Sequence, residues 1–275
     1  MMVYMGFMEQ IIQEYRIMIS RAFGAMIVLT YLITGPAENW NFITDMTVDL
    51  VQFVGGDATV IAAARVSTKA EASRADLERS PRESAGLINY LVKSRHGSPL
   101  EHNLFTFYIE APIFVFREFH RHRIGWSYNE TSGRYRELSP VFYVPDAFRP
   151  LVQVGKPGHY TFEQGATEQY HSTTAVLADS YAASYLHYQQ LLEQGIAKEV
   201  ARACLPVGIY SSMYATCNAR ALMHFLGLRT SRENATFPSY PQWEIEMVAN
   251  EMEDFFKDKM PMTWEAFNEN GRVSP

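Results

Sequence analysis

Cysteine is scarce in this chain of 275 residues, which has only Cys204 and Cys217. Two cysteines cannot form a disulfide scaffold or, by themselves, a zinc site, so we expect a reducing, cytoplasmic environment. Nothing in the sequence around either residue indicates an activated thiolate. We therefore interpret both cysteines as small buried side chains rather than as nucleophiles.

Long apolar runs are also missing. The most apolar stretch, Ala22 to Ile33, is shorter than the ~20 residues that a membrane-spanning helix needs. A secretory signal peptide fits poorly, because Glu9 and Glu14 precede that stretch. We interpret residues 1–45 as an N-terminal extension of unknown role, either an appended helix or translated upstream sequence before a natural start at Met46. Residues 46–275 are expected to form a single domain.

The common nucleotide-binding motifs are absent as well, since the chain contains neither GxGxxG nor a P-loop. The formal net charge is −6, which argues against a general nucleic-acid coat protein, because non-specific binding needs a broad positive surface. The histidines at 96, 102, 120 and 122 have no carboxylate at a recognisable ligand spacing. We therefore expect no metal site.

Hydrophobic periodicity and breaker residues divide the rest of the chain into strands and helices. Strands are expected at 48–54, 105–109, 141–144 and 209–216. Helices are expected at 57–64, 81–95 (with Ser80 as cap), 112–123, 167–193, 198–205, 219–228 and 241–257, with Thr263 capping a short last helix. Loops are expected at 127–133 and 155–165. Tyr181, Tyr185 and Tyr188 form a stripe that predicts core or a subunit interface.

Positive charge is concentrated between Phe116 and Arg136, although the protein as a whole is acidic. This stretch holds arginines at 117, 121, 123, 134 and 136. The guanidinium group matches two phosphate oxygens at once, so several arginines together favour a phosphate ligand. The alternative is a solvated basic helix followed by a loop. Aromatic residues interleaved with the charges, Trp126, Tyr128 and Tyr135, weaken that alternative.

The spacing of these arginines predicts two ligands rather than one. On a helix, Arg121 and Arg123 would lie about 200° apart, at ~100° per residue. The following Ser132, Gly133 and Arg134 offer a hydroxyl, backbone N–H groups and a guanidinium in consecutive positions. Such a tip is suited to cradle a phosphate.

A second set of polar residues is expected on the helix that begins after Asn218, which is a good N-cap. Arg220 and His224 lie four residues apart and share one face. Arg229 falls toward the apolar side of this helix and must find an acceptor if it is partly buried. The alternative for Arg229 is a helix-end cation stabilised by the helix dipole.

These motifs resemble those of a known family. Arg121-His122-Arg123, eight intervening residues and then Ser132-Gly133-Arg134 resemble the signature of the flavin-dependent thymidylate synthases. Three further blocks are similar to the same family in the same order: 96–102, 202–206, and 218–220 followed by His224 and 228–229. The resemblance extends from about 48 to 267. It departs at Trp126, which lengthens the central loop, and at 231–240, which looks like an insertion.

The resemblance implies an α+β fold with a central, mostly antiparallel sheet flanked by long helices. It implies the reductive methylation of dUMP to dTMP, with methylenetetrahydrofolate as one-carbon donor and NADPH-reduced FAD as hydride carrier. The implied flavin contacts are Ser98, Arg121, His122, Arg123, Glu130, Asn218, Arg220 and His224. The implied dUMP contacts are Glu118, Arg121, Glu130, Ser132, Gly133, Arg134, Arg202 and Arg229. It also implies a homotetramer with active sites shared between subunits.

Arg229 is the expected catalytic residue, because a cation beside the pyrimidine stabilises negative charge that develops on the ring. Ser132 has no evident base partner, so we interpret it as a hydrogen-bond donor to substrate. Two alternatives stay open. One is another flavin or nucleotide-binding enzyme on the same scaffold, which would form no thymidylate. The other is an RNA-binding module, which the acidic net charge disfavours.

Overall fold

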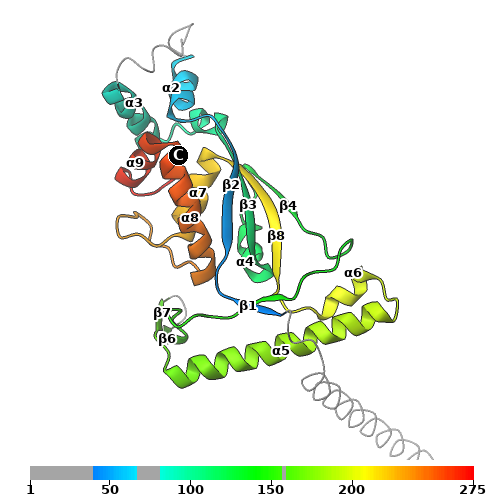
Figure 1. Cartoon of the computed structure of the whole chain (residues 1–275). Helices are drawn as coiled ribbons and strands as arrows, with labels where there is room; N and C mark the ends of the chain where they lie inside the picture. The colour runs from blue at the N-terminus through cyan, green and yellow to red at the C-terminus, as the bar shows by residue number, and fades with distance from the viewer. Residues whose placement is uncertain (1–39, 67–80, 157–158) are drawn as a thin grey trace, which may run out of the picture.

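The computed structural model describes residues 40–66, 81–156 and 159–275 (Figure 1). Most of the predicted N-terminal extension, and the predicted cap Ser80, therefore lie outside the described residues. The last part of the extension contributes strand β1 (Asn41–Ile43), which pairs in parallel with β5 (Val141–Tyr143). These residues are thus joined to the rest of the fold by backbone hydrogen bonds.

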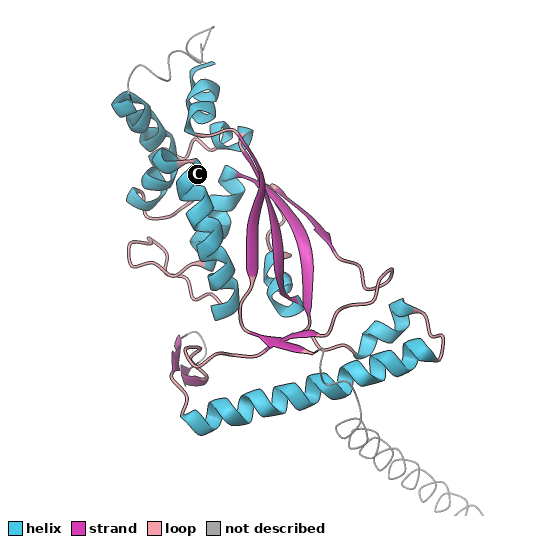
Figure 2. Ribbon diagram, viewed as in Figure 1, coloured by secondary structure: helices cyan, strands magenta, loops and turns pink. Residues whose placement is uncertain are grey.

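An antiparallel four-stranded sheet lies at the centre, in the order β2-β3-β8-β4 (Figure 2). Its strands are β2 (Thr47–Val54), β3 (Leu104–Pro112), β8 (Tyr210–Asn218) and β4 (Trp126–Glu130). The side chains of β3 alternate: Phe105, Phe107 and Ile109 are fully buried, whereas Tyr108 and Glu110 face the other side. The predicted α+β fold with a mostly antiparallel central sheet is confirmed.

Helices cover the apolar face of this sheet. They are α4 (Ile113–Phe119), α7 (Ala219–Arg229) and α8 (Trp243–Lys259). Phe256 of α8 packs edge-on against Phe105, and Phe225 of α7 stacks on Phe119 of α4 with ring centroids 4.9 Å apart. One continuous core therefore joins the sheet to the helices that carry the predicted site residues.

Three more helices, α2 (Asp57–Val66), α3 (Pro81–Lys93) and α9 (Pro261–Glu269), gather at one end of the sheet (Figure 1). Asp57 accepts hydrogen bonds from the backbone N–H groups of Met262 and Thr263 and from the Thr263 hydroxyl. The prediction that Thr263 caps the last helix is therefore wrong. Thr263 lies inside α9, and Asp57 from a distant part of the chain satisfies the free N–H groups instead.

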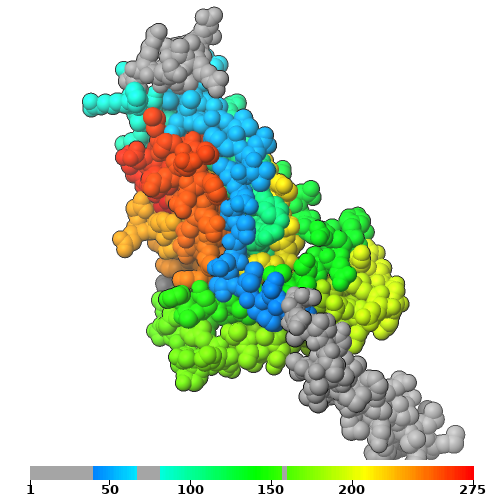
Figure 3. Space-filling model, in the orientation of Figure 1, coloured from blue at the N-terminus to red at the C-terminus, as the bar shows by residue number. Residues whose placement is uncertain are grey.

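A second, smaller core lies under the sheet, where α5 (Thr167–Glu193) crosses below β5 and is followed by α6 (Lys198–Ala201) and a short 3-10 helix (Arg202–Cys204). Tyr181 stacks on Phe142 at 5.1 Å, and Tyr185 and Tyr188 are buried beside them. The predicted bounds of this helix and the core role of its tyrosine stripe are confirmed. In the space-filling view, the β1–β2 segment runs over the front between the α8 side and the α6 side (Figure 3).

Two predictions around the basic stretch are wrong. The helix ends at Phe119 instead of reaching Arg123, because the N–H of His122 donates to the Phe119 carbonyl (2.8 Å) and closes a turn. Arg121 and Arg123 therefore do not project from opposite sides of a helix. The segment predicted as a loop from Ser127 onward begins instead as strand β4. Half-buried Trp126 and Tyr128 alternate there with exposed polar residues, but the polar composition of the segment as a whole hid this alternation.

The predicted loop at 155–165 is also wrong. The segment contains a hairpin of β6 (Val152–Lys156) and β7 (His159–Glu163), paired from Val152 opposite Glu163 onward. Its glycines had indicated a loop, yet Gly155 is paired within β6 at a φ of +99°, a conformation that glycine adopts readily.

A buried ion network ties the end of the chain to the end of α7. Arg272 is 4% exposed and donates to both carboxylate oxygens of Glu253, at 2.6 and 3.0 Å, and to the Thr230 hydroxyl at 2.9 Å. Its φ of +58° is unusual for a side-chain-bearing residue. Burial alone would raise the pKa of Glu253, but the hydrogen bond and charge of Arg272, helped by Trp264 and Arg232, hold it below its usual value.

Replacing Arg272 by leucine is expected to destabilise the fold by about 3 kcal/mol, because it leaves the buried Glu253 carboxylate without its main partner. The measurement is the free energy of unfolding in urea. Lys259→Ala, which removes an exposed ion pair with Asp258, serves as control and should change stability by less than about 0.5 kcal/mol. Equal effects of the two substitutions would contradict the prediction.

The difference between the wild type and Arg272→Leu should also depend on pH. The lowered pKa of Glu253 means that its stabilising contribution is present at neutral pH and is lost as the pH falls below the ordinary carboxyl value of 4.5. The difference in the free energy of unfolding between the wild type and Arg272→Leu should therefore become smaller as the pH is lowered.

Candidate active site

Arg229 lies at the last position of α7 and is held by two residues from the other side of the core. Its Nη1 is 2.8 Å from Oε2 of Glu118, its Nε donates to Nε2 of His122 at 3.1 Å, and its Nη2 donates to the Glu118 carbonyl at 3.4 Å. The Arg229 side chain is only 18% exposed. A partly buried arginine has thus found acceptors, as expected, and three predicted site residues come together. We call Arg229, Glu118 and His122 the Arg229 group.

The environment of His122 explains how it can face a guanidinium group. His122 is 6% exposed and packs edge-on against Phe225 at 4.9 Å. Burial, followed by the charge of Arg229 and the nearby His224, lowers its pKa to about 4. The imidazole is therefore neutral at pH 7, and its Nε2 lone pair is free to accept a hydrogen bond from Arg229.

The turn that carries His122 is closed by a residue that sequence reasoning did not place in the site. The Tyr128 hydroxyl lies 2.9 Å from the carbonyl oxygen of Phe119 and 3.0 Å from that of His122. Gly125, with a φ of +73°, brings the same turn against α7, where an added Cβ would lie 2.9 Å from the Cβ of Ala221. The aromatic residues among the charges were the available signal for Tyr128.

A second group gathers at the start of α7. Asn218 accepts a hydrogen bond from the N–H of Ala221 at 2.8 Å, which confirms its role as N-cap. Arg220 pairs with Glu101 at 2.6 Å and also donates to the Pro275 carbonyl. Glu101 belongs to a short 3-10 helix (Ser98–His102) that packs against α7. Sequence reasoning missed Glu101, although it lies within the matched block 96–102.

The approach of Arg220 to that 3-10 helix depends on a glycine. A Cβ at Gly97 would lie 2.5 Å from Arg220 Nε, so only glycine leaves room for the guanidinium group there. Arg220 and His224 are both exposed on one face of α7, as predicted. Together with exposed Ser98 and half-buried Asn218, they form one polar strip with positive charge near a helix N-terminus, an arrangement suited to an anionic ligand. We call it the Arg220 strip.

A third group surrounds the Ser132–Arg134 tip, which follows β4. The backbone N–H of Arg134 donates to the Ser132 hydroxyl at 3.3 Å, and Arg134 Nε pairs with Glu199 at 2.9 Å. A Cβ on Gly133 would lie 3.3 Å from the Cδ of Arg202, so the tip and Arg202 are in contact. We call Ser132, Gly133, Arg134 and Arg202 the Ser132 group.

The structure does not bring all the predicted residues together in one chain. Within the described residues, no hydrogen bond or ion pair joins the Ser132 group to the Arg229 group. Glu130 is the last residue of β4. Arg121 and Arg123 are exposed in the turn after α4 and form no hydrogen bond or ion pair through their side chains with another described residue.

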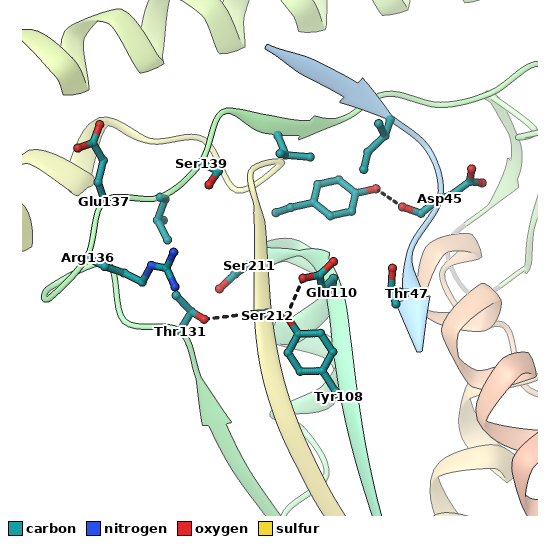
Figure 4. A pocket seen from close by; sticks show the side chains of 14 residues that line it. Asp45, Thr47, Tyr108, Glu110, Thr131, Arg136, Glu137, Ser139, Ser211 and Ser212 are labelled. Carbon is teal, nitrogen blue, oxygen red and sulfur yellow. Dashed lines mark hydrogen bonds between the residues drawn. The ribbon is translucent and has the colours of Figure 1, made fainter. Parts of the chain in front are cut away.

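A pocket of about 380 Å³ is lined by residues on both sides of the Ser132–Arg134 tip in the sequence, among them Thr131 and Arg136 (Figure 4). Arg136 reaches toward it from one side and Glu110 from the other, and the buried Ser211 hydroxyl has no hydrogen-bond partner. Thr131, which is hydrogen-bonded to Ser212 at 2.7 Å, also lines it. None of the predicted flavin or dUMP contacts lines this pocket.

Neither cysteine is placed for nucleophilic chemistry. Burial raises the pKa of the Cys217 thiol well above its usual value, and it also raises that of Cys204. Across the described parts of the chain, no three His, Cys, Asp or Glu side chains are grouped to hold a metal ion. In the same parts, no helix has both the length and the apolar character needed to cross a membrane.

Comparison with known proteins assigns this arrangement to a family. A family model described as "Thymidylate synthase complementing protein" matches residues 49–262. The flavin-dependent thymidylate synthase of Streptomyces coelicolor is 60% identical over 232 residues, covering 84% of this chain and 94% of that protein. That of Tropheryma whipplei is 52% identical over 234 residues, covering 85% and 97%.

Solved structures agree with the sequence comparison. The UMP/dUMP methylase PolB from Streptomyces cacaoi, bound with 5-Br dUMP, superimposes with a TM-score of 0.80 at 51% identity. The match covers 86% of this chain and all of that one, and the same enzyme bound with 5-Br UMP gives 0.79. With a family match over most of its length and relatives at 60% identity, this chain belongs to the flavin-dependent thymidylate synthase family.

Proposed function

We propose that this protein converts dUMP to dTMP by reductive methylation. In this reaction methylenetetrahydrofolate supplies the one-carbon unit, NADPH supplies the reducing electrons, and tetrahydrofolate and NADP⁺ are released. The observation that carries the proposal is the Arg229 group, in which a partly buried guanidinium is held by a neutral histidine and a carboxylate. The function named for the relatives from Streptomyces coelicolor and Tropheryma whipplei supports it.

The Arg220 strip fits FAD. It offers an exposed guanidinium and imidazole on one face of a helix whose N-terminus favours anions, which suits a dinucleotide phosphate. Ser98 and Asn218 flank the same surface, while His122, with Arg121 and Arg123 in the adjoining turn and Glu130 after it, extends the surface toward Arg229. Bound FAD, reduced by NADPH, would supply the hydride.

Arg229 would activate the pyrimidine. A fixed guanidinium beside the pyrimidine stabilises negative charge on the ring, and this makes C5 of dUMP nucleophilic toward the one-carbon unit. His122 orients Arg229 without adding a second positive charge, because it is neutral at pH 7. Glu118 holds the guanidinium before substrate binds, and the pyrimidine would compete for part of that contact.

The Ser132 group would bind the phosphate of dUMP. Arg134 and Arg202 supply cations, and Ser132 and the N–H groups of the tip supply neutral donors. Because no hydrogen bond or ion pair joins this group to the Arg229 group among the described residues, we propose that each active site combines the Ser132 group of one subunit with the Arg229 group of another. A homotetramer with shared sites would have this property.

The first test is thymidylate formation by the purified protein. Product should form from dUMP with FAD, NADPH and methylenetetrahydrofolate, and it should disappear when FAD or NADPH is omitted. UMP should be assayed in parallel, because PolB is described as a UMP/dUMP methylase. A folded, flavin-loaded protein that forms no thymidylate would refute the proposal and leave a nucleotide-binding flavoprotein with another reaction.

Arg229→Ala should lower kcat by at least about 100-fold, because it removes the cation that stabilises the developing charge. FAD absorbance and the urea midpoint show whether the variant is still folded and loaded. Lys93→Ala, which removes an exposed cation at the end of α3, is the control and should retain activity. Substantial activity in folded Arg229→Ala would assign the role elsewhere.

Mixing two inactive variants tests whether the sites are shared. Arg202→Ala damages the Ser132 group and Arg229→Ala damages the Arg229 group, so a mixed oligomer can contain sites in which both groups are intact. With equal amounts of the two variants, each of the two groups in a site is intact with a probability of about one half, so about a quarter of wild-type activity should return. The measurement is activity after co-refolding at equal concentrations. If both groups of a site belong to one subunit, mixing will restore nothing.

A further inference from the structure

Tyr128 has a contact that the proposed mechanism does not use. Its hydroxyl bridges two backbone carbonyls, those of Phe119 and His122, at 2.9 and 3.0 Å. These are the first and last residues of the turn that follows α4. A phenol has one proton, so it is shared between both acceptors, and the contact works as a clamp across the turn.

The ring of Tyr128 is fixed independently of its hydroxyl. It stacks on Trp126 with ring centroids 5.6 Å apart and planes within 9°, and it meets Phe119 and His120 edge-on. Burial raises the pKa of the phenol, so it remains a donor at any pH at which the protein would be assayed. The clamp is therefore rigid on the strand side.

The clamped turn ends in the acceptor for Arg229. The carbonyl of His122 is held by Tyr128, and the Nε2 atom of the same residue accepts a hydrogen bond from Arg229 Nε at 3.1 Å. The turn also has a backbone hydrogen bond of its own, from the N–H of His122 to the Phe119 carbonyl at 2.8 Å. That bond fixes where the turn closes, and the Tyr128 hydroxyl is the contact that anchors its last carbonyl to the sheet.

We propose that the Tyr128 hydroxyl is a positioning group for the Arg229 group: by bridging the carbonyls of Phe119 and His122, it fixes the turn that holds His122 against Arg229. The role of this contact in catalysis rests on the proposed function. The role of the contact in fixing His122 is independent of the proposed function, because the hydrogen bonds that fix this residue form within the protein without any ligand.

The test is Tyr128→Phe, which keeps the stacked ring and removes only the hydroxyl. With the clamp gone, kcat/KM for dUMP should fall about tenfold, the equivalent of one lost hydrogen bond between positioned groups. Most of this loss should be in kcat, because the Ser132 group that would bind the phosphate is untouched. Tyr210→Phe is the matched control: it removes a hydroxyl that donates to the Asp45 carbonyl at 2.9 Å, and kcat/KM should stay within about twofold.

Histidine NMR separates positioning from simple packing. His122 faces Arg229 and His224 from α7, Glu118 from α4 through Arg229, and the apolar Trp126 and Phe225. In the wild type it should stay neutral until the pH approaches about 4. In Tyr128→Phe a loosened turn admits water to His122, so the titration of His122 should move up by about one pH unit. His122→Asn identifies the resonance.

Each outcome decides between the roles. A raised His122 titration together with a loss in kcat supports the proposal. If Tyr128→Phe and Tyr210→Phe lower the urea midpoint alike and leave the His122 titration unchanged, the hydroxyl is only structural and the proposal is wrong. If the wild type forms no thymidylate, the proposed function fails, and the NMR titration still tests the clamp.

Discussion

The antiparallel pairing of β8 with β3 on one side and β4 on the other is the constraint on which the site depends. β8 leads directly into α7 through the Asn218 cap, so the sheet fixes where that helix begins and ends. β4 follows the turn that carries His122 and precedes the Ser132 group. The pairing of β8 with β4 therefore sets the relative positions of the Arg220 strip, the Arg229 group and the Ser132 group.

The electrostatics of the Arg229 group follow from burial more than from the number of charges. The basic stretch holds many arginines, yet the cation that pairs with Glu118 and His122 from this stretch is Arg229, which comes from a helix far along the chain. Its partner histidine is kept neutral by the apolar core. A charged histidine there would repel the guanidinium, so the core that stabilises the fold also makes this contact possible.

The sequence predicted correctly those elements in which apolar or aromatic residues recur at a regular spacing. The long tyrosine-striped helix, the Asn218 cap and the partly buried Arg229 all follow from spacing in the sequence, and the matched motifs supplied the family. Most failures have a common cause, which is that long-range contacts decided the local structure; the local β6–β7 hairpin is the exception. Polar β4 is a strand because β8 pairs with it, the α4 helix stops early where the turn packs on Phe225, and Asp57 caps α9 from more than two hundred residues away. The separation of the Ser132 and Arg229 groups was likewise invisible to motif spacing.

The strand nature of β4 restricts where this segment can change length. Side chains alternate along a strand, so one extra residue within the paired part would send Tyr128 to the opposite face and reverse every contact beyond it. The segment between Arg123 and Ser132 has eight residues, and Trp126 is in register with Cys217. A residue added to this segment is therefore better accommodated in the turn, where Ile124 is 94% exposed and Gly125 bends the chain. A change of length in this segment can therefore be tolerated in the turn that precedes β4, and not within the residues of β4 that pair with β8.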